Sequence, residues 1–535
     1  MNNNITQKTT STFLIGNSMK QLAILAFALF VITGTQAQVG IGVNPPDPSA
    51  MLHVQATDKG LLIPRMTDVQ RIAIAGPAEG LLVYQTNANV GFWYFTNDQW
   101  QPLSSLNNGG LHTIYLTDNI TNAQAIAKIA AEYGPNTREI RIVSCTNLTT
   151  VDLSMFTKLS EVFINGNTAL QTVNLNNLQT VDGGINIDQC PVLTSLALPN
   201  LTKVGISAYN SMGLSVQNTA LTNLSLPLLT SLAGYVYVQY NNSLTAINFP
   251  LLASHNLING FPILIVWNNV LTNISFGSMQ SVWDLQIESN RNLTTVNLPV
   301  LATSRNLTIS NALSLTSLSL PALTTTGQLR VSGDSALASF SAPVLATATS
   351  VSLESSVALA SANLPSLTSV SDKLNLLGNT IMTTASFPAL ITTANLSINA
   401  CPALSSLSLP LLASSTFNLY GPSALTTISM PSLTTISGSS VIGNTYSYNM
   451  IAGHQNLTSI VMNALTGFTG SSIQFVSNIL PSTQVNYLLN KFSSITPALS
   501  GKIINFVQSV PAPPTGQGLI DKATLIAGGN SVTTD

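Results

Sequence analysis

Charged residues are scarce in this sequence. Asp, Glu, Lys and Arg make up only 7% of the 535 residues, and the formal net charge is -2, whereas ordinary soluble domains contain about 25% charged residues. A surface with so few charges has no field that attracts nucleic acid or an anionic membrane. Hydrophobic residues nevertheless reach 45%, so the chain can bury a core and disorder is not expected. We expect no nucleic-acid partner.

The residues that usually carry chemistry are also few. The only histidines are His53, His112, His255 and His454, which lie far apart in the sequence. We expect solvent-facing or loop histidines, and neither a metal site nor a cofactor. The chain has no Gly-x-Ser-x-Gly nucleophile elbow, and Val39–Gly42 lacks the third glycine of a dinucleotide-binding loop. The sequence therefore predicts a protein that is not an enzyme and has no catalytic residues.

Long apolar runs are missing as well, apart from one near the start of the chain. Residues 22–32 are apolar, but eleven residues are too few to span a bilayer, which takes about twenty. Lys20 precedes this run and the small-residue segment Thr35–Ala37 follows it, as in a secretory signal peptide. The sequence predicts a signal peptide over 1–37, with Met19 as an alternative start. We expect a secreted or outer-surface protein without direct membrane insertion.

An internal repeat of about 22 residues occupies the chain from residue 145 to residue 465. Each copy has an apolar anchor, and eight residues after every anchor stands another apolar residue. Repeats of this length are typical of solenoids, in which each copy buries its apolar face only against its neighbours. The fourteen anchors are Leu148, Leu170, Leu193, Leu221, Leu244, Leu271, Leu293, Leu315, Leu337, Leu359, Met382, Leu404, Leu425 and Leu457.

One copy illustrates the predicted strands. After the anchor Leu315, two leucines alternate with serines over residues 317–320 and Pro321 follows, which indicates a strand with one buried face that ends at the proline. A second short strand follows, with Leu329 and Val331 facing inward. The fold class predicted is all-β: a parallel leucine-rich β-solenoid with capping helices and a small N-terminal β module.

A polar position lies three residues before many of the anchors. An inward Asn there would hydrogen-bond the backbone of neighbouring turns. The three cysteines share this position, and Cys145 and Cys190 are two turns apart, about 9–10 Å at the strand spacing. This exceeds the limit of about 7 Å for a disulfide, so we predict three buried free thiols. The residues at this position include Asn167, Asn218, Asn241, Asn268, Asn290, Asn379, Cys145, Cys190 and Cys401.

The flanks of the repeat predict three further parts. Residues 38–105 are expected to form an N-terminal β module that packs independently, with short strands at 51–54 and 60–65 and a hairpin formed by 80–84 and 91–95. Residues 106–140 are expected to cap the solenoid (141–470), and residues 471–535 to cap its other end. The capping-box pattern of residues 121–124 opens one helix, and a second begins near residue 482. The expected packing faces of these helices are Ile126, Ile129, Ala130 and Tyr133 in the first, and Val485, Leu488, Leu489 and Phe492 in the second.

Two families resemble parts of this chain. Residues 39–42, 48–52, 58–66 and 80–84 resemble an N-terminal module of exported surface proteins of Bacteroidota, which implies a mounting role. The repeats, with phrases such as residues 315–324, resemble the receptor L-domain and the surface leucine-rich repeats of the same bacteria. The resemblance implies recognition or adhesion, and it transfers no binding residue.

Two insertions disturb the repeat and mark the candidate site. They fall at 206–213 and 253–262, and interrupted positions of a scaffold are where binding usually resides. Exposed aromatic side chains on a neutral rod suit stacking on sugars or a protein hot spot. The alternative is that the inserted loops fold over these rings and bury them. The candidate binding patch consists of Tyr235, Tyr237, Leu264 and Val266, which face outward, and of Tyr240, Trp267 and Trp283 nearby.

The sequence thus favours a non-catalytic, secreted or cell-surface protein that recognises an extracellular protein or glycan. We expect a monomeric rod. One alternative is a polysaccharide-active enzyme, for which the best acids are Asp284, Glu288, Asp334 and Glu354. The other is a purely structural surface or matrix component.

Overall fold

The computed structural model describes residues 38–87, 90–96, 98–103, 112–205, 212–255, 260–420, 424–443 and 454–535. The predicted signal peptide (1–37) and most of the two insertions lie outside these residues. The chain divides into two compact units, Met1–Asn107 and Asn108–Asp535. Among the described residues, no helix is long and apolar enough to cross a membrane.

The first unit contains two small sheets. In one, β1 and β2 pair in parallel, and in the other, β4 and β5 form the predicted hairpin while β6 extends it antiparallel. The predicted strand at 60–65 is reduced to its last residue, which begins β3. The elements are β1 (Val39–Ile41), β2 (Leu52–Val54), β3 (Arg65–Met66), α2 (Asp68–Ile72), β4 (Leu82–Gln85), β5 (Gly91–Thr96) and β6 (Gln99–Pro102).

This first unit buries little of its apolar surface. Val83 and Trp93 are buried, and the guanidinium of Arg71 lies 3.9 Å from the centre of the Trp93 ring. Leu62 is 80% exposed and Val69 72%. The core of this module is therefore small, and most of its apolar side chains remain in contact with water.

Each of the fourteen predicted repeat copies contains a short strand in the second unit. Their central side chains are buried or nearly so, and the flanking side chains face outward. These strands are β9 (Thr150–Asp152), β11 (Thr172–Asn174), β13 (Ser195–Ala197), β16 (Asn223–Ser225), β19 (Ala246–Asn248), β22 (Asn273–Ser275), β24 (Thr295–Asn297), β26 (Ser317–Ser319), β28 (Ser339–Ser341), β30 (Ser361–Asn363), β32 (Thr384–Ser386), β34 (Ser406–Ser408), β36 (Thr427–Ser429) and β39 (Ser459–Val461).

The second strand of each copy is the longer one, whereas the sequence predicted another short strand. In nine copies it is unbroken: β10 (Lys158–Asn165), β12 (Thr180–Asp188), β23 (Ser281–Glu288), β25 (Thr303–Ser310), β27 (Thr325–Ser332), β29 (Thr347–Glu354), β31 (Ser369–Leu377), β33 (Thr392–Asn399) and β35 (Ser414–Tyr420). Four further strands lie beyond the copies: β7 (Thr113–Thr117) and β8 (Glu139–Val143) before them, and β42 (Ile503–Asn505) and β43 (Ser531–Thr533) after them. In five turns the strand is divided: β14 (Lys203–Val204) and β15 (Met212–Gln217), β17 (Ser231–Leu232) and β18 (Tyr235–Gln239), β20 (Ser254–His255) and β21 (Pro262–Val266), β37 (Thr435–Ile436) and β38 (Ser440–Gly443), β40 (Gly467–Phe468) and β41 (Ser472–Val476).

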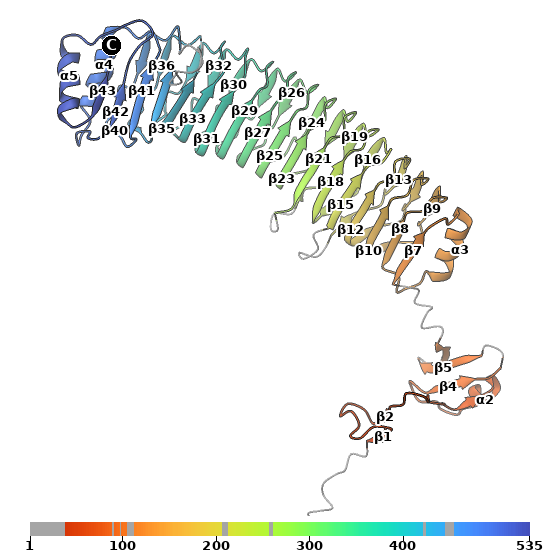
Figure 1. Ribbon diagram of the computed structural model, residues 1–535. Helices are drawn as coiled ribbons and strands as arrows, with labels where there is room; N and C mark the ends of the chain where they lie inside the picture. Colours follow the sequence, from red (N-terminus) through yellow and green to blue (C-terminus); the bar gives the residue numbers. More distant parts are fainter. Residues whose placement is uncertain are drawn as a thin grey trace, which may run out of the picture. The chain divides into compact units, whose positions relative to one another are not determined.

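Parallel pairing of these long strands creates one continuous sheet. Leu285 of β23 pairs with Leu307 of β25, which pairs with Leu329 of β27, so the same apolar position recurs in the core of each turn. Figure 1 shows the long strands side by side along the inner side of the curved solenoid, with the short strands along its outer side. The fold is a parallel β-solenoid, as predicted. It has about 16 turns because strands beyond the fourteen copies extend the stack at both ends.

A ladder of buried polar side chains follows one bend of the solenoid. The Nδ2 of Asn290 donates to the carbonyl oxygen of Ile265 at 2.7 Å, and its Oδ1 accepts from the backbone N–H of Asn268 at 2.9 Å. We call this set the asparagine ladder. Its members are Cys145, Asn167, Cys190, Thr219, Asn241, Asn268, Asn290, Ala312, Asp334, Ser356, Asn379, Cys401, His454 and Asn478.

The ladder confirms most of the residues predicted for it. All three cysteines are buried and free, and burial raises the pKa of the Cys145 thiol to about 11. Asn218 is a correction: it is exposed with a positive φ of 49°, and Thr219 occupies the ladder position instead. The hydroxyl of Thr219 donates to the Oδ1 of Asn241 at 2.7 Å. The end of strand β15 is in regular register with β18, so the shift arises after the ladder position: two residues lead from Thr219 to the anchor Leu221, whereas three lead from Asn241 to Leu244.

Helices close both ends of the solenoid. The first is α3 (Asn122–Glu132), which begins with the predicted capping box of Thr121 and Gln124. Its buried face is Ala125 and Ile129, so the predicted face was wrong for three of its four members, Ile126, Ala130 and Tyr133, which are exposed.

At the other end, α4 (Ser482–Ser493) buries all four residues of its predicted face. The final helix α5 (Gln517–Ala527) and strand β43 complete this cap.

Candidate functional site

Strands β18 and β21 position the outward members of the candidate patch. Tyr237 pairs with Leu264, and Gln239 pairs with Val266. Their side chains point away from the core because the alternate residues, including Val236 and Ile263, are fully buried. The outward side chains of β18 and β21 are half-buried, and those after the strand ends are exposed. The structure thus brings six of the seven candidate residues onto two adjacent turns.

The rings of this patch contact one another in two groups. At the start of the strands, Tyr235 stacks on Tyr237 with 5.4 Å between ring centroids, and Phe261 lies 4.5 Å from Tyr235. At the end of the strands, Tyr240 stacks on Trp267 at 5.0 Å. We call the whole set the aromatic stripe: Tyr235, Tyr237, Tyr240, Phe261, Leu264, Val266 and Trp267. From Tyr235 to Tyr240 it spans about 16 Å at the rise of a strand, across two strands about 4.8 Å apart.

Sequence reasoning missed Phe261. This residue falls at the end of the second insertion, where no strand alternation indicates its direction. Trp283 was placed correctly near the patch but does not belong to the stripe. Its indole lies against Gly260, and the guanidinium of Arg305 stacks on it at 4.7 Å. Trp283 is half-buried and lies at the border of the patch.

Backbone conformation sets Tyr240 and Trp267 apart from all other members. Both have positive φ, 58° and 55°, at the residue that precedes the ladder position. The same register holds small or flexible residues in other turns, such as Gly166, Ser289 and Asn311, also with positive φ. A bulky side chain there costs of order 1 kcal/mol of backbone strain. Neither ring is buried, since Tyr240 is 42% exposed and Trp267 46%, so packing does not explain why aromatics occupy this position.

Few charges lie near the stripe, and the two on the adjacent strand β23 are acidic: Asp284 pairs with Pro262, and Glu288 pairs with Val266. The sequence contains no Asp, Glu, Lys or Arg from Val204 to Trp283. His255, the only histidine in this stretch, is fully buried, and its Nε2 lies 3.0 Å from the carbonyl oxygen of Gly234. Burial lowers the pKa of His255 to about 4, so its ring is neutral at physiological pH. Its position corrects the expectation of solvent-facing or loop histidines, and His454 is likewise buried.

The acids of the alternative enzyme hypothesis do not form one site. Asp334 is fully buried in the asparagine ladder, and burial raises its pKa to about 7. Glu354 binds Arg330 at 3.1 Å and accepts a hydrogen bond from Asn375. Asp284 accepts a hydrogen bond from Gln286 on its own strand. Glu288 lies four residues after Asp284 on this strand. Within the described residues, no group of three His, Cys, Asp or Glu side chains could hold a metal ion.

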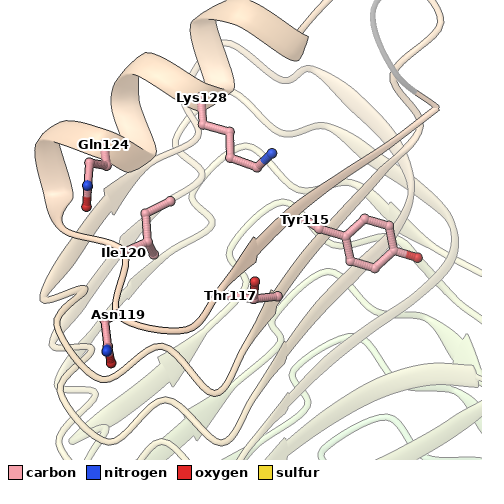
Figure 2. A pocket seen from close by; sticks show the side chains of 6 residues that line it. All are labelled: Tyr115, Thr117, Asn119, Ile120, Gln124 and Lys128. Carbon is pink, nitrogen blue, oxygen red and sulfur yellow. The ribbon is translucent and has the colours of Figure 1, made fainter.

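A separate hollow lies at the N-terminal end of the solenoid. It has a volume of about 440 Å³ and is lined by the edge strand β7, the loop after it and helix α3. Figure 2 shows Tyr115 and Thr117 on the strand, with Lys128 reaching from the helix. Its polar groups have structural partners: Gln124 completes the capping box, and Lys128 pairs with Glu132. The hollow therefore lacks a cluster of groups that could carry out chemistry.

Comparisons with known proteins support only part of this description. A family model described as a phage tail like trimerisation region matches residues 40–122, a minor part of the chain. No curated protein matches the sequence significantly. The solved structures that share similarity include the two that follow. The functional domain of InlJ from Listeria monocytogenes, described as including a cysteine ladder, is 16% identical over 76% of this chain and 75% of its own, with a TM-score of 0.19. The TLR13 chain of a TLR13-ssRNA13 complex is 13% identical over 74% and 82%, with a TM-score of 0.14. These low scores constrain no function, and the solenoid is defined by its own strand pairing.

Proposed function

We propose that this chain is a non-catalytic recognition or adhesion protein, secreted or held at a cell surface, whose solenoid binds an extracellular partner through the aromatic stripe. The observation that carries the proposal is the exposed, stacked pair Tyr240–Trp267: two aromatic residues stand at a register where the fold requires positive φ and where they are strained. Large rigid rings dominate binding energies at interfaces. The resemblance of the repeats to receptor L-domains and to surface proteins of Bacteroidota supports the same function.

Binding to a defined panel tests this proposal. The purified chain from residue 38 onward is passed over immobilised mucin, fibronectin, collagen, mannan, galactan, glucan and polygalacturonate. We expect saturable binding to at least one of them, and loss of that binding in the triple variant Tyr235→Ala, Tyr237→Ala, Trp267→Ala. The control is Tyr115→Ala, which removes an exposed ring (51% exposed) from the same face of the sheet at the rod end.

Three outcomes contradict the proposal. The first is the absence of binding to every member of the panel. The second is unchanged binding by the folded triple variant. The third is loss of binding in Tyr115→Ala alone, which would move the site to the hollow of Figure 2. Circular dichroism and thermal unfolding of each variant establish that it is folded.

We propose in addition that the N-terminal module joins three copies of the chain. The description of the family model that matches residues 40–122 supports this, and so does the sparse core of the first unit. Its exposed apolar side chains include Leu62, Val69 and Ile72. A groove of about 180 Å³ nearby is lined by Leu61, Tyr84 and Phe92 among others. Three stripes held together would raise avidity without any new contact. The proposed trimer replaces the monomeric rod expected from the sequence.

Mass measurement in solution tests the trimer. Light scattering of the chain from residue 38 onward is expected to give three times the mass of one chain. Replacement of Leu62, Val69 and Ile72 by Ser is expected to lower it to that of one chain. The matched control is Leu411→Ser, because Leu411 is an apolar side chain of the solenoid that is also exposed, at 51%. A single-chain mass for the unaltered protein contradicts the proposal.

A further inference from the structure

The stacked pair of Tyr240 and Trp267 leaves one face of each ring uncovered by the other. Tyr240 and Trp267 lie nearly parallel, with 18° between their ring planes, so each ring covers one face of the other and keeps its outer face. The residues at the same register in the turns on either side are Asn218 and Ser289. Both side chains are small, so neither fills the space beside an aromatic ring. The pair therefore offers flat apolar faces at the edge of the sheet.

The groups next to these faces are amides and hydroxyls on one side and the carboxylate of Glu288, which pairs with Val266, on the other. Gln239 donates from its Nε2 to the Oε1 of Gln217 at 2.6 Å, and Ser215 precedes Gln217 on the same outward face of β15. An amide both donates and accepts hydrogen bonds, as a sugar hydroxyl does. The stretch from Val204 to Trp283 contains no Lys or Arg, and the neighbouring charges Asp284 and Glu288 are carboxylates, so an anionic ligand finds repulsion rather than a partner of opposite sign.

We infer that the Tyr240–Trp267 pair is a stacking subsite for a neutral glycan. A pyranose ring has an apolar C–H face and a rim of hydroxyl groups, which match the outer ring faces and the amides of Gln217 and Gln239. Tyr237 and Leu264 extend the apolar surface toward the other end of the strands, so successive sugar units would lie along the aromatic stripe, across the rod. This inference rests on the proposed function and names the ligand class of its site.

Asparagine substitutions separate binding from folding at this site. Asn tolerates positive φ better than an aromatic residue, and Asn218 and Asn311 adopt it in the same register. The double variant Tyr240→Asn, Trp267→Asn is therefore expected to keep or raise the melting temperature. If the two rings had only a structural role, their removal would lower the melting temperature.

Titration calorimetry and an oligosaccharide array measure the ligand. The probes are neutral oligosaccharides derived from mannan, galactan and glucan, with polygalacturonate oligosaccharides as the anionic comparison. We expect at least one neutral probe to bind, no binding of the anionic one, and at least a tenfold loss of affinity in the double variant. Tyr115→Ala is expected to keep the affinity of the unaltered chain.

The results that overturn the inference are distinct from those that overturn the proposed function. Preference for polygalacturonate, equal affinity of the double variant, or loss of binding accompanied by a lower melting temperature overturns the glycan inference. If fibronectin, collagen or mucin binds through the aromatic stripe and no neutral oligosaccharide binds or competes, the recognition function stands and the glycan inference fails. If no probe binds at all, both fail.

Discussion

Replacement of Asp334 by Asn is expected to stabilise the solenoid, although it removes one of its few charges. Asp334 is fully buried in the asparagine ladder, where its Oδ1 accepts from the backbone N–H of Ala312 at 2.7 Å. Its Oδ2 is buried and has no hydrogen-bond partner. At the equivalent position, the Nδ2 of Asn290 donates to a carbonyl oxygen one turn back. By the same register, an Asn at position 334 would donate to the carbonyl of Ile309.

The size of the effect follows from the pKa of this carboxyl group. Burial raises the pKa of Asp334 from 3.8 to about 7, and each unit corresponds to 1.36 kcal/mol, so the ionised form costs at most about 4 kcal/mol. Below about pH 4 the carboxyl group is protonated in both the folded and the unfolded chain, so the cost is absent. Between pH 4 and 7 only the unfolded chain ionises, so stability falls by about 1.4 kcal/mol per pH unit. Above pH 7 the full cost applies, and the Asn variant escapes it.

Urea unfolding at pH 4, 6 and 8 measures this difference, and hydrogen exchange of β25, β27 and β29 measures it locally, because a solenoid need not unfold as one unit. We expect a gain near zero at pH 4 and its maximum at pH 8. The matched control is Asn290→Asp, which introduces a carboxyl group at another ladder position and is expected to lose stability as the pH rises. Equal stability of Asp334→Asn and the unaltered chain at pH 8 would refute the reasoning, as would a gain that does not change with pH.

Other ladder positions give three further predictions. His454→Asn is expected to raise the melting temperature more at pH 5 than at pH 8. Burial lowers the pKa of His454 from 6.5 to about 4, so at pH 5 the ring is protonated in the unfolded chain but neutral in the folded one. This difference destabilises the fold at pH 5, and the Asn variant removes it. An equal shift at both pH values contradicts this. Asn379→Ala is expected to lower the unfolding free energy by about 2 kcal/mol, since it leaves the N–H of Ser356 and the carbonyl of Leu353 unpaired; an unchanged urea midpoint opposes it. The buried thiols of Cys145 and Cys190 are expected to react with a thiol reagent only in urea, and rapid labelling of the native chain is the contrary result.

Periodicity carried most of the fold prediction. A leucine that recurs at a fixed spacing, as at Leu293, Leu315 and Leu337, must occupy the same place in every turn, because stacking is the only way each copy buries its apolar face. The asparagine ladder, the free cysteines and the capping box of Thr121 and Gln124 follow from the same regularity or from local hydrogen bonding. These features depend on short-range pattern, which the sequence displays directly.

The errors fall where the local pattern does not determine the neighbours. The ladder position Thr219 was mistaken for Asn218 because it was counted back from the anchor Leu221, which follows the ladder one residue sooner in this turn than in its neighbours. The helix face of α3 was misjudged because several of its alanines and isoleucines fit either of two apolar faces. We expected His255 and His454 at the surface because histidine is only moderately often buried in proteins. Their register in the turn places them inside instead.

The candidate site was partly predictable. Alternation placed Tyr235 and Tyr237 on the outward face of a strand, and the insertions marked the turns that differ from the rest. The positive φ of Tyr240 and Trp267 could not be read from the residues themselves, because aromatic residues rarely adopt it. A comparison of the same register across turns, which holds Gly166, Ser289 and Asn311, would have shown the anomaly once the register was known.

Hydrogen–deuterium exchange of the chain, alone and saturated with the probe that binds it, tests the central claim most directly. The account predicts slower exchange in residues 235–241 and 262–268, where the aromatic stripe would be covered, with no change in the outer strands of the turns from β26 to β34. Protection confined to the cap helices or to those outer strands, with residues 235–241 and 262–268 unaffected, would contradict it.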